Sequence, residues 1–218
     1  MKNKFIKFFL SILIMSQNAW PSNVSLDISK WSLVTYSKIK PNTLKQRKMG
    51  LEIIVNNSSS ALVYKFPQPV KIRNIKIKAQ LKGNLNYKRK APGSKNADDF
   101  PLRLGIILKG KKTLNFIQKT IAPNWLIKLD KMASNHGGFK SIYSLIFHTN
   151  KPLFHKRKHP LSPYFIEQIG GKFNHSKLNV LHSYKETYEI IGLWISSDGD
   201  DTNSSYKVII NELSVIGP

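Results

Sequence analysis

An alternation of apolar and polar residues with a period of two is the feature that most constrains the fold of this chain. The clearest case is the segment 75–81, with the sequence Ile-Lys-Ile-Lys-Ala-Gln-Leu. Successive side chains of a β-strand point to opposite faces, so this segment predicts a strand with one face in a core and a lysine-bearing face in water. Further segments rich in β-branched or aromatic residues are also predicted as strands: 51–55, 61–66, 102–108, 142–147, 189–196 and 206–215.

Clusters of turn-forming residues separate these segments at 56–60, 67–69, 82–84, 91–94 and 109–111. Seven or more strands with few helices predict an all-β fold, a single jelly-roll-like β-sandwich. In the last strand the apolar phase shifts between Ile210 and Leu213, which predicts a β-bulge near Asn211 and Glu212.

The N-terminus has the pattern of a secretory signal peptide. Lys2, Lys4 and Lys7 precede an apolar stretch over residues 8–15, and a small residue, Ala19, ends the polar patch that follows. We predict a signal peptide over residues 1–19 and a periplasmic or secreted protein. The apolar stretch is shorter than the roughly 20 residues that a transmembrane helix needs. The mature chain is therefore predicted to lack a transmembrane span and to form one β-sandwich domain over residues 20–218, which we expect to be a monomer.

Composition limits the chemistry and suggests partners. The chain has no cysteine, which excludes a lipidated N-terminal Cys, disulfides, thiolate metal sites and a Cys nucleophile. It has 35 Lys and Arg against 12 Asp and Glu, and removal of residues 1–19 leaves a formal charge of +20. Such a charge favours proximity to lipid headgroups, acidic polysaccharide or nucleic acid. The codon bias of an AT-rich genome also produces lysine-rich chains, so charge alone does not identify a partner.

The region 128–185 departs from the strand pattern. It contains a Gly-Gly pair, three prolines and all six histidines of the chain. We expect a long excursion over the sandwich, mainly within residues 148–180, that consists of loops and one or two short helices. The segment 163–169 is the strongest helical candidate.

The tip of this excursion is the densest basic run of the mature chain: His155, Lys156, Arg157, Lys158 and His159. The spacing of its two histidines is compatible with zinc ligands, but three intervening cations oppose a divalent ion and no third ligand lies nearby in the sequence. We therefore predict a solvated basic loop. If this basic run binds a ligand, phosphate or sulfate groups fit best.

Catalytic motifs are absent from the sequence. It has no Gly-x-Ser-x-Gly elbow, phosphate loop, dinucleotide fingerprint or His-Glu-x-x-His motif. His136-Gly137-Gly138 resembles the start of an esterase oxyanion loop, but without a nucleophile elbow it predicts a turn.

Two short acidic segments, 98–103 and 197–202, hold five of the twelve carboxylates. Each borders a predicted strand, so we expect the strands to carry both segments to one rim of the sandwich. The acidic rim cluster so defined consists of Asp98, Asp99, Arg103, Asp198, Asp200, Asp201 and Thr202.

Three interpretations of the acidic rim cluster stay open. In the first, aspartates pair with Arg103 and accept loop N–H groups, which is a structural role. In the second, calcium is bound by Asp99, Asp198, Asp200 and Asp201, because calcium takes six to eight oxygen ligands. In the third, Asp99 acts with Asp198 or Asp201 as the acid and base of a polysaccharide hydrolase. We rank catalysis below structure and assign no catalytic residue.

Aromatic residues offer a test for carbohydrate binding, because sugar-binding faces present Trp or Tyr as flat platforms. The platform candidates are Trp125, Tyr143, Tyr164 and Tyr184, although for each a place in the core is favoured, because large aromatic residues dominate sandwich interiors. Trp31 and Trp194 lie within apolar runs and are predicted to be buried.

The sequence resembles a family of exported bacterial domains, the domain-of-unknown-function family numbered 3047. The resemblance covers roughly residues 31–216 and is most specific in two blocks. The first block has Asp98, Asp99, Phe100, Pro101 and Arg103, and the second has Asp198, Asp200, Asp201 and Thr202. It implies a jelly-roll sandwich akin to carbohydrate-binding modules and implies no activity. The histidine-bearing excursion and the high lysine content depart from the family.

The sequence favours an exported, non-catalytic binding module for an envelope glycan or glycoconjugate, with calcium as a possible cofactor. The first alternative is a protein that binds polyanions or an anionic membrane surface through its lysine-bearing face and the 155–159 run. The second alternative is the carboxylate-based hydrolase described above.

Overall fold

The computed structural model describes residues 21–160 and 162–218. The predicted signal peptide lies outside the described residues. Within the described part of the chain, no helix is long and apolar enough to cross a membrane.

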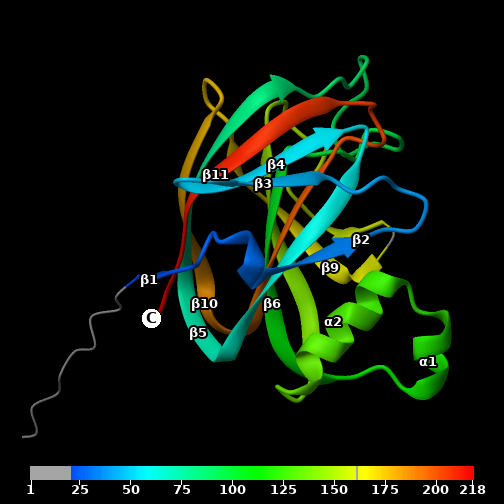
Figure 1. Cartoon of the computed structure of the whole chain (residues 1–218), viewed down its shortest axis with the longest axis vertical. Coiled ribbons are helices and arrows are strands. Elements are labelled where there is room, and N and C mark those ends of the chain that lie inside the picture. The colour runs from blue at the N-terminus through cyan, green and yellow to red at the C-terminus, as the bar shows by residue number, and fades with distance from the viewer. Residues whose placement is uncertain (1–20, 161) are drawn as a thin grey trace, which may run out of the picture.

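The described residues form β-strands and a few short helices. In chain order these are β1 (Ser22–Asn23), the 3-10 helix η1 (Ile28–Lys30), β2 (Trp31–Thr35), β3 (Thr43–Arg47), β4 (Gly50–Asn56), β5 (Ser59–Asn84), β6 (Leu102–Lys112), α1 (Phe116–Ile121), α2 (Asn124–Ser134), β7 (Phe139–His148), β8 (Lys156–His159), β9 (Ser162–Lys172), β10 (Lys177–Asp198) and β11 (Ser205–Ile216). The fold is an all-β, jelly-roll-like sandwich, as predicted (Figure 1).

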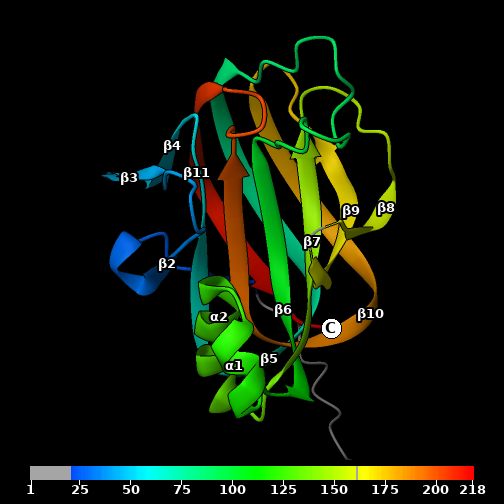
Figure 2. The same ribbon diagram turned by 90° about the vertical axis from the view of Figure 1, so that its right-hand side faces the viewer.

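The sandwich is one continuous sheet folded into two layers, which share the long strands β5 and β10 (Figures 1 and 2). The front layer has the order β3-β4-β11-β5-β10 and uses the second half of β5 and the first half of β10. The back layer contains β2, the first half of β5, the second half of β10, and then β6, β7, β9 and β8. Strands β7 and β9 run parallel, whereas the other paired strands are antiparallel.

Strand β5 passes through two positions where the sequence predicts turns, and both of these predictions are wrong. At 67–69 the strand bends between the layers, where its register with β10 jumps from Val70 opposite Ile190 to Lys65 opposite Gly192. Proline has no N–H group to donate, so it is tolerated at such an irregularity. The segment 82–84 is the end of the same strand, paired with β11.

The β-bulge predicted in the last strand is confirmed. The register between β11 and β5 shifts between Ile210 and Glu212. The extra residue returns the following apolar side chains, Leu213 and Val215, to the core, where both are buried.

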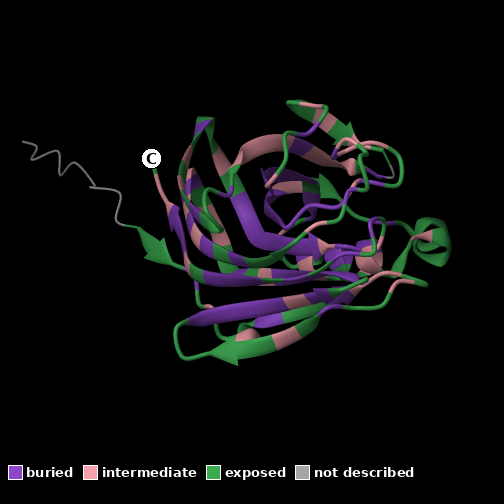
Figure 3. Cartoon of the chain, turned by 90° about the horizontal axis from the view of Figure 1, so that it is seen from above, coloured by how far each residue is buried: buried purple, intermediate pink, exposed green. Residues whose placement is uncertain are grey.

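A large apolar core fills the space between the two layers, and in the view from above buried residues line their facing sides (Figure 3). Trp31 belongs to this core, as predicted. A second apolar cluster lies on the outer face of the back layer. Figure 2 shows α2 lying against this face. There α2 buries Leu126, Leu129 and Ala133, spaced on one helical face, against residues that include Trp194, whose predicted burial is also confirmed.

The helix-bearing excursion lies earlier in the chain than the sequence predicts. Both α-helices of the described residues fall between β6 and β7, within 113–138. The segment 163–169, predicted as helical, belongs to strand β9 instead. Strand β9 pairs with β7 and β8 and so extends the back layer. The His136-Gly137-Gly138 segment forms a turn after α2, as predicted.

Candidate functional site

The structure brings the two acidic segments together at one end of the sandwich. Asp98 and Asp99 shortly precede β6, while Asp198 is the last residue of β10, and the antiparallel pairing of these strands places the segments side by side. The Asp98 N–H donates to Asp201 Oδ2 at 3.2 Å, and the Phe100 N–H donates to Asp198 Oδ1 at 2.8 Å. Carboxylates of the second segment therefore satisfy backbone donors of the first.

Asp99 connects the acidic segment 197–202 to the acidic segment 98–103 by hydrogen bonds. Its Oδ2 accepts the Thr202 N–H at 2.7 Å and the Thr202 hydroxyl at 2.6 Å. The Tyr206 hydroxyl lies 2.8 Å from the Asp198 carbonyl and 3.1 Å from that of Phe100, and so donates between the two segments. These contacts hold the acidic loops in one geometry.

Arg103 lies at the centre of the acidic rim cluster. Its side chain is only 7% exposed. The guanidinium donates from Nε to Glu167 Oε1 at 3.1 Å, from Nη1 to Asp198 Oδ2, and from Nη2 to the Asp98 carbonyl at 2.6 Å. The predicted pairing of Arg103 with acidic-rim aspartates is thus present, and it includes a carboxylate that the sequence analysis did not single out.

That carboxylate, Glu167, bridges two arginines. It is fully buried in β9, and its Oε2 accepts from Arg157 Nε at 2.6 Å. Arg157 also donates from Nη2 to Asp98 Oδ1 at 2.5 Å and from Nη1 to the Gly93 carbonyl at 3.1 Å. One signal for this site was present in the sequence: an acidic residue within an apolar stretch of a chain that has few acids.

The prediction of a solvated loop for the basic run 155–159 is wrong. Residues Lys156–His159 form strand β8, which pairs with β9. Because strand side chains alternate, Lys156 and Lys158 are exposed, whereas Arg157 and His159 are turned toward the acidic rim cluster. His155 is exposed. The run therefore offers only part of its charge to solvent.

The carboxyls of the acidic rim cluster differ in proton affinity. Burial raises the pKa of Asp99, and it raises the pKa of Asp198 to about 8 although Arg103 acts in the opposite direction. Burial also disfavours ionised Glu167, but Arg103 and Arg157 outweigh it and hold the pKa of this carboxyl below its ordinary value. The site thus contains both a carboxyl that readily takes up a proton and one that resists protonation.

A cavity of about 570 Å³ opens beside the acidic rim cluster on the outer face of the back layer. Outward-facing residues of three strands line it: Arg103 of β6, Phe165 and Glu167 of β9, and Trp194, Ser196 and Asp198 of β10. Residues at the end of β2 and just after it (within 35–39), residues 122–125 at the junction of α1 and α2, and the acidic loops complete its lining. Residues far apart in the sequence therefore meet around one opening.

Aromatic rings line one side of this cavity. Trp125, at the start of α2, has its ring centre 5.4 Å from that of Phe165 and 6.2 Å from that of Trp194. Tyr164 adjoins this group, at 6.5 Å from Trp125. The four predicted platform residues do not form one surface, because Tyr143 and Tyr184 lie together within the core between the layers.

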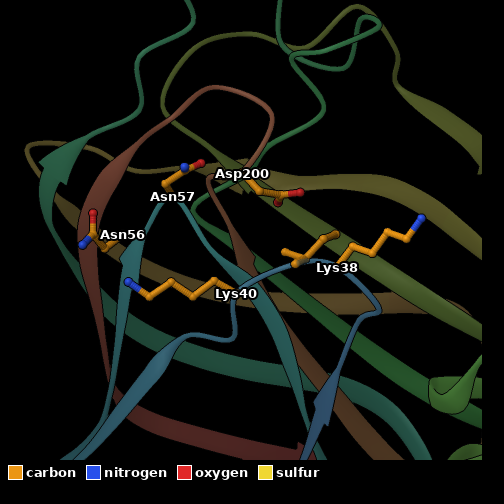
Figure 4. A pocket seen from close by; sticks show the side chains of 6 residues that line it. Lys38, Lys40, Asn56, Asn57 and Asp200 are labelled. Carbon is orange, nitrogen blue, oxygen red and sulfur yellow. The ribbon is translucent and has the colours of Figure 1, made fainter.

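A second hollow, of about 620 Å³, adjoins the same rim (Figure 4). It is lined by Lys38, Ile39, Lys40, Asn56, Asn57 and Asp200. Asp200 and Ile39 line both hollows, so the two hollows adjoin. Burial raises the pKa of Asp200, and the neighbouring Asp99 carboxylate raises it further.

Among the described residues, no group of three or more His, Cys, Asp or Glu side chains is arranged to hold a metal ion. Of the four aspartates in the calcium hypothesis, Asp99 and Asp198 direct oxygens to protein donors, namely Thr202, Arg103 and the Phe100 N–H. Calcium binding at Asp99, Asp198, Asp200 and Asp201 stays a prediction, and the donor arrangement favours the structural interpretation.

Comparison with known proteins gives similarity in structure only. No protein-family model and no curated protein matches the chain. Among solved structures, the chain is similar to the family 11 carbohydrate-binding module of a cellulosomal cellulase of Clostridium thermocellum, with 13% identity, a TM-score of 0.40, and coverage of 92% of this chain and 96% of that one. It is also similar to the xylan-binding module CBM15, with 9% identity, a TM-score of 0.39, and coverage of 91% and 96%. Likenesses at these identities and TM-scores do not identify a ligand for this chain.

Proposed function

We propose that the cavity beside the acidic rim cluster binds a glycan, and that the chain is an exported, non-catalytic binding module for an envelope glycan or glycoconjugate. One observation carries this proposal: aromatic rings and charged hydrogen-bonding groups line the same cavity. The rings of Trp125, Phe165 and Trp194 lie together in its lining, which also includes Arg103 and Asp198.

This combination suits a sugar because a pyranose ring has apolar C–H faces and a hydroxyl-bearing edge. The aromatic side can cover a C–H face, while carboxylates accept hydrogen bonds from hydroxyls and the guanidinium donates to ring or hydroxyl oxygens. A volume of about 570 Å³ falls within the range of small-molecule sites, roughly 300–1,000 Å³. Fixed arginine–carboxylate contacts also hold the polar groups in place before a ligand arrives.

The same contacts favour binding over hydrolysis. A glycosidase needs one carboxyl as a proton donor and a second as base or nucleophile. Here Asp198 and Glu167 are both engaged by Arg103, and Asp99 accepts from Thr202. Their role is best explained as positioning the loops and the arginine.

Membership of the domain-of-unknown-function family numbered 3047 is a second part of the proposal. The two sequence blocks that carry the resemblance, 98–103 and 198–202, are the ones whose residues bind each other at the cavity rim. A β-sandwich with the same acidic rim in all members of the family would account for both sequence blocks.

A glycan array with and without chelator, followed by calorimetry on the best ligand, tests the proposal. Trp125→Ala should weaken binding at least tenfold, because it removes an aromatic wall of the cavity. Phe116→Ala is the matched control: it removes an exposed aromatic ring that does not line the cavity. Circular dichroism checks that Trp125→Ala stays folded, and Asp200→Asn gives a second cavity variant.

Absence of any glycan ligand, or equal affinity of the intact chain and Trp125→Ala, would contradict glycan binding in this cavity. Turnover of a polysaccharide that is abolished by Asp99→Asn would establish the hydrolase instead. Loss of binding with chelator, restored by calcium, would support the metal hypothesis.

A further inference from the structure

Helix α1 exposes its large apolar side chains to solvent. Phe116, Ile117 and Ile121 are 86%, 72% and 81% exposed, and no residue of this helix is buried. At 3.6 residues per turn these three side chains fall, together with Thr120, within one arc of about 140°. Isolated exposed apolar residues are common, but three on one face of a six-residue helix form a patch that calls for an explanation.

Polar contacts hold α1 in place. A helix of this length is not stable alone in water. Its start is fixed by a capping box between Asn115 and Gln118. Buried Asp130 of α2 accepts the Leu114 N–H at 2.7 Å and pairs with Lys119 Nζ at 3.3 Å. Lys119 lies outside the apolar arc, so this tether leaves the arc turned away from α2. Figure 1 shows α1 at the periphery of the molecule.

The surroundings of α1 are strongly basic. Between residues 109 and 140 the exposed lysines are Lys111, Lys112, Lys119, Lys128, Lys131 and Lys140. The only acidic residue in this stretch of sequence is Asp130, which is buried. The chain segment that carries the apolar arc therefore has exposed lysines on both sides of it in the sequence and no exposed acid.

From this geometry we propose that α1 docks on an anionic lipid bilayer, with Phe116, Ile117 and Ile121 inserted at the interface and the neighbouring lysines on the lipid headgroups. Aromatic and aliphatic residues combined with flanking lysines provide the two contributions that interfacial binding requires, apolar burial and attraction to anionic lipid. Charge argues against a second copy of this chain as the occupant, because a contact between two α1 faces would bring like-charged lysines together.

Docking through α1 would also orient the cavity. The helix leads directly into residues 122–125, which form a wall of the cavity. The cavity mouth would then lie near the boundary between lipid and water. The docking proposal stands on the exposure and charge of α1 and does not depend on what the cavity binds.

Vesicle flotation tests the proposal. The chain should float with vesicles of phosphatidylglycerol and phosphatidylcholine in equal amounts and much less with phosphatidylcholine alone. The triple variant Phe116→Ser, Ile117→Ser, Ile121→Ser should bind the anionic vesicles at least tenfold more weakly. A matched control carries the same number of exposed apolar residues changed elsewhere, Met49→Ser, Leu153→Ser and Leu181→Ser, and should bind like the parent chain.

A site-specific readout separates α1 from the N-terminal segment, which all variants share. Tryptophan introduced as Phe116→Trp should be quenched by lipids with brominated acyl chains, whereas Met49→Trp should not. Equal flotation of the α1 triple variant and the control triple variant, together with absence of quenching at position 116, would overturn the proposal. So would a dimer of the parent chain that the α1 triple variant abolishes, because a second copy would then cover the arc.

Discussion

Arg103→Ala should cost about 3 kcal/mol of folding free energy. The side chain is almost fully buried and donates to Asp198 and Glu167, so its removal leaves the Glu167 carboxylate and the buried Asp198 carboxyl short of a partner inside the protein. Breaking one partner from a buried ion pair costs roughly 3–5 kcal/mol. We expect a cost at the lower end of this range, because Glu167 still accepts a hydrogen bond from Arg157 and Asp198 still accepts one from the Phe100 N–H.

Urea unfolding at neutral pH, followed by tryptophan fluorescence, measures this loss as a shift in midpoint at constant slope. Arg103→Lys keeps the positive charge but loses the planar guanidinium that donates to several acceptors at once. Its stability should therefore lie between that of the parent and that of the alanine variant. Lys109→Ala, which breaks an exposed pair with Glu189, is the matched control and should cost at most about 0.5 kcal/mol. A loss below about 0.5 kcal/mol for Arg103→Ala would refute the reasoning.

The effect should also depend on pH. Arg103 and Arg157 hold the pKa of Glu167 below its ordinary value, despite burial. A depressed carboxyl pKa stabilises the folded state above the unfolded pKa, about 4.3, and this contribution is lost as the pH falls through the folded pKa. The part of the stability loss of Arg103→Ala that comes from Glu167 should therefore become smaller at acidic pH. A stability loss that increases at acidic pH would contradict the lowered pKa of Glu167.

Three further outcomes are expected. Burial lowers the pKa of His159, so neutral His159 contributes to the free energy of unfolding above about pH 6.5, and this contribution is lost as the pH falls. His159→Gln should therefore lose less unfolding free energy than the parent between pH 8 and pH 5.5. The control His155→Gln, which changes an exposed residue, should lose as much as the parent. Gly105→Ala should cost roughly 1–3 kcal/mol and shift Trp194 emission, because its Cβ would lie 2.6 Å from Ile142 Cγ2; an unchanged midpoint would contradict this. Adding calcium should leave the midpoint of thermal unfolding unchanged, because protein donors already bind the carboxyl groups of Asp99 and Asp198. A clear rise in this midpoint would support the calcium site.

The strands could be predicted wherever one face is buried and the other is exposed to solvent, because apolar and polar residues then alternate along the sequence. The alternation at 75–81 and the phase shift at Asn211 and Glu212 both have direct counterparts in the register of β5 and β11. The turn predictions at 67–69 and 82–84 failed for a physical reason: proline and glycine mark bends and ends of strands as well as turns, and pairing between distant strands decides which. Sequence alone does not show that pairing.

The acidic rim was predictable in part. Two acidic segments at strand ends are expected to meet when those strands pair, as β6 and β10 do. Glu167 was missed, and Arg157 was predicted only as part of a basic loop, because their pairing forms only when β8 and β9 join the edge of the back layer. The cavity wall contributed by Trp125 depends on how α2 packs, and no local pattern encodes that.

Strand β11 lies between β4 and β5, so the strand that closes the front layer comes after both of its neighbours in the chain. Until Ser205–Ile216 is available, β4 and β5 have open backbone edges, and the nascent polypeptide has no complete native state to adopt. Truncation before Ser205 should yield an aggregating product in place of a smaller stable unit.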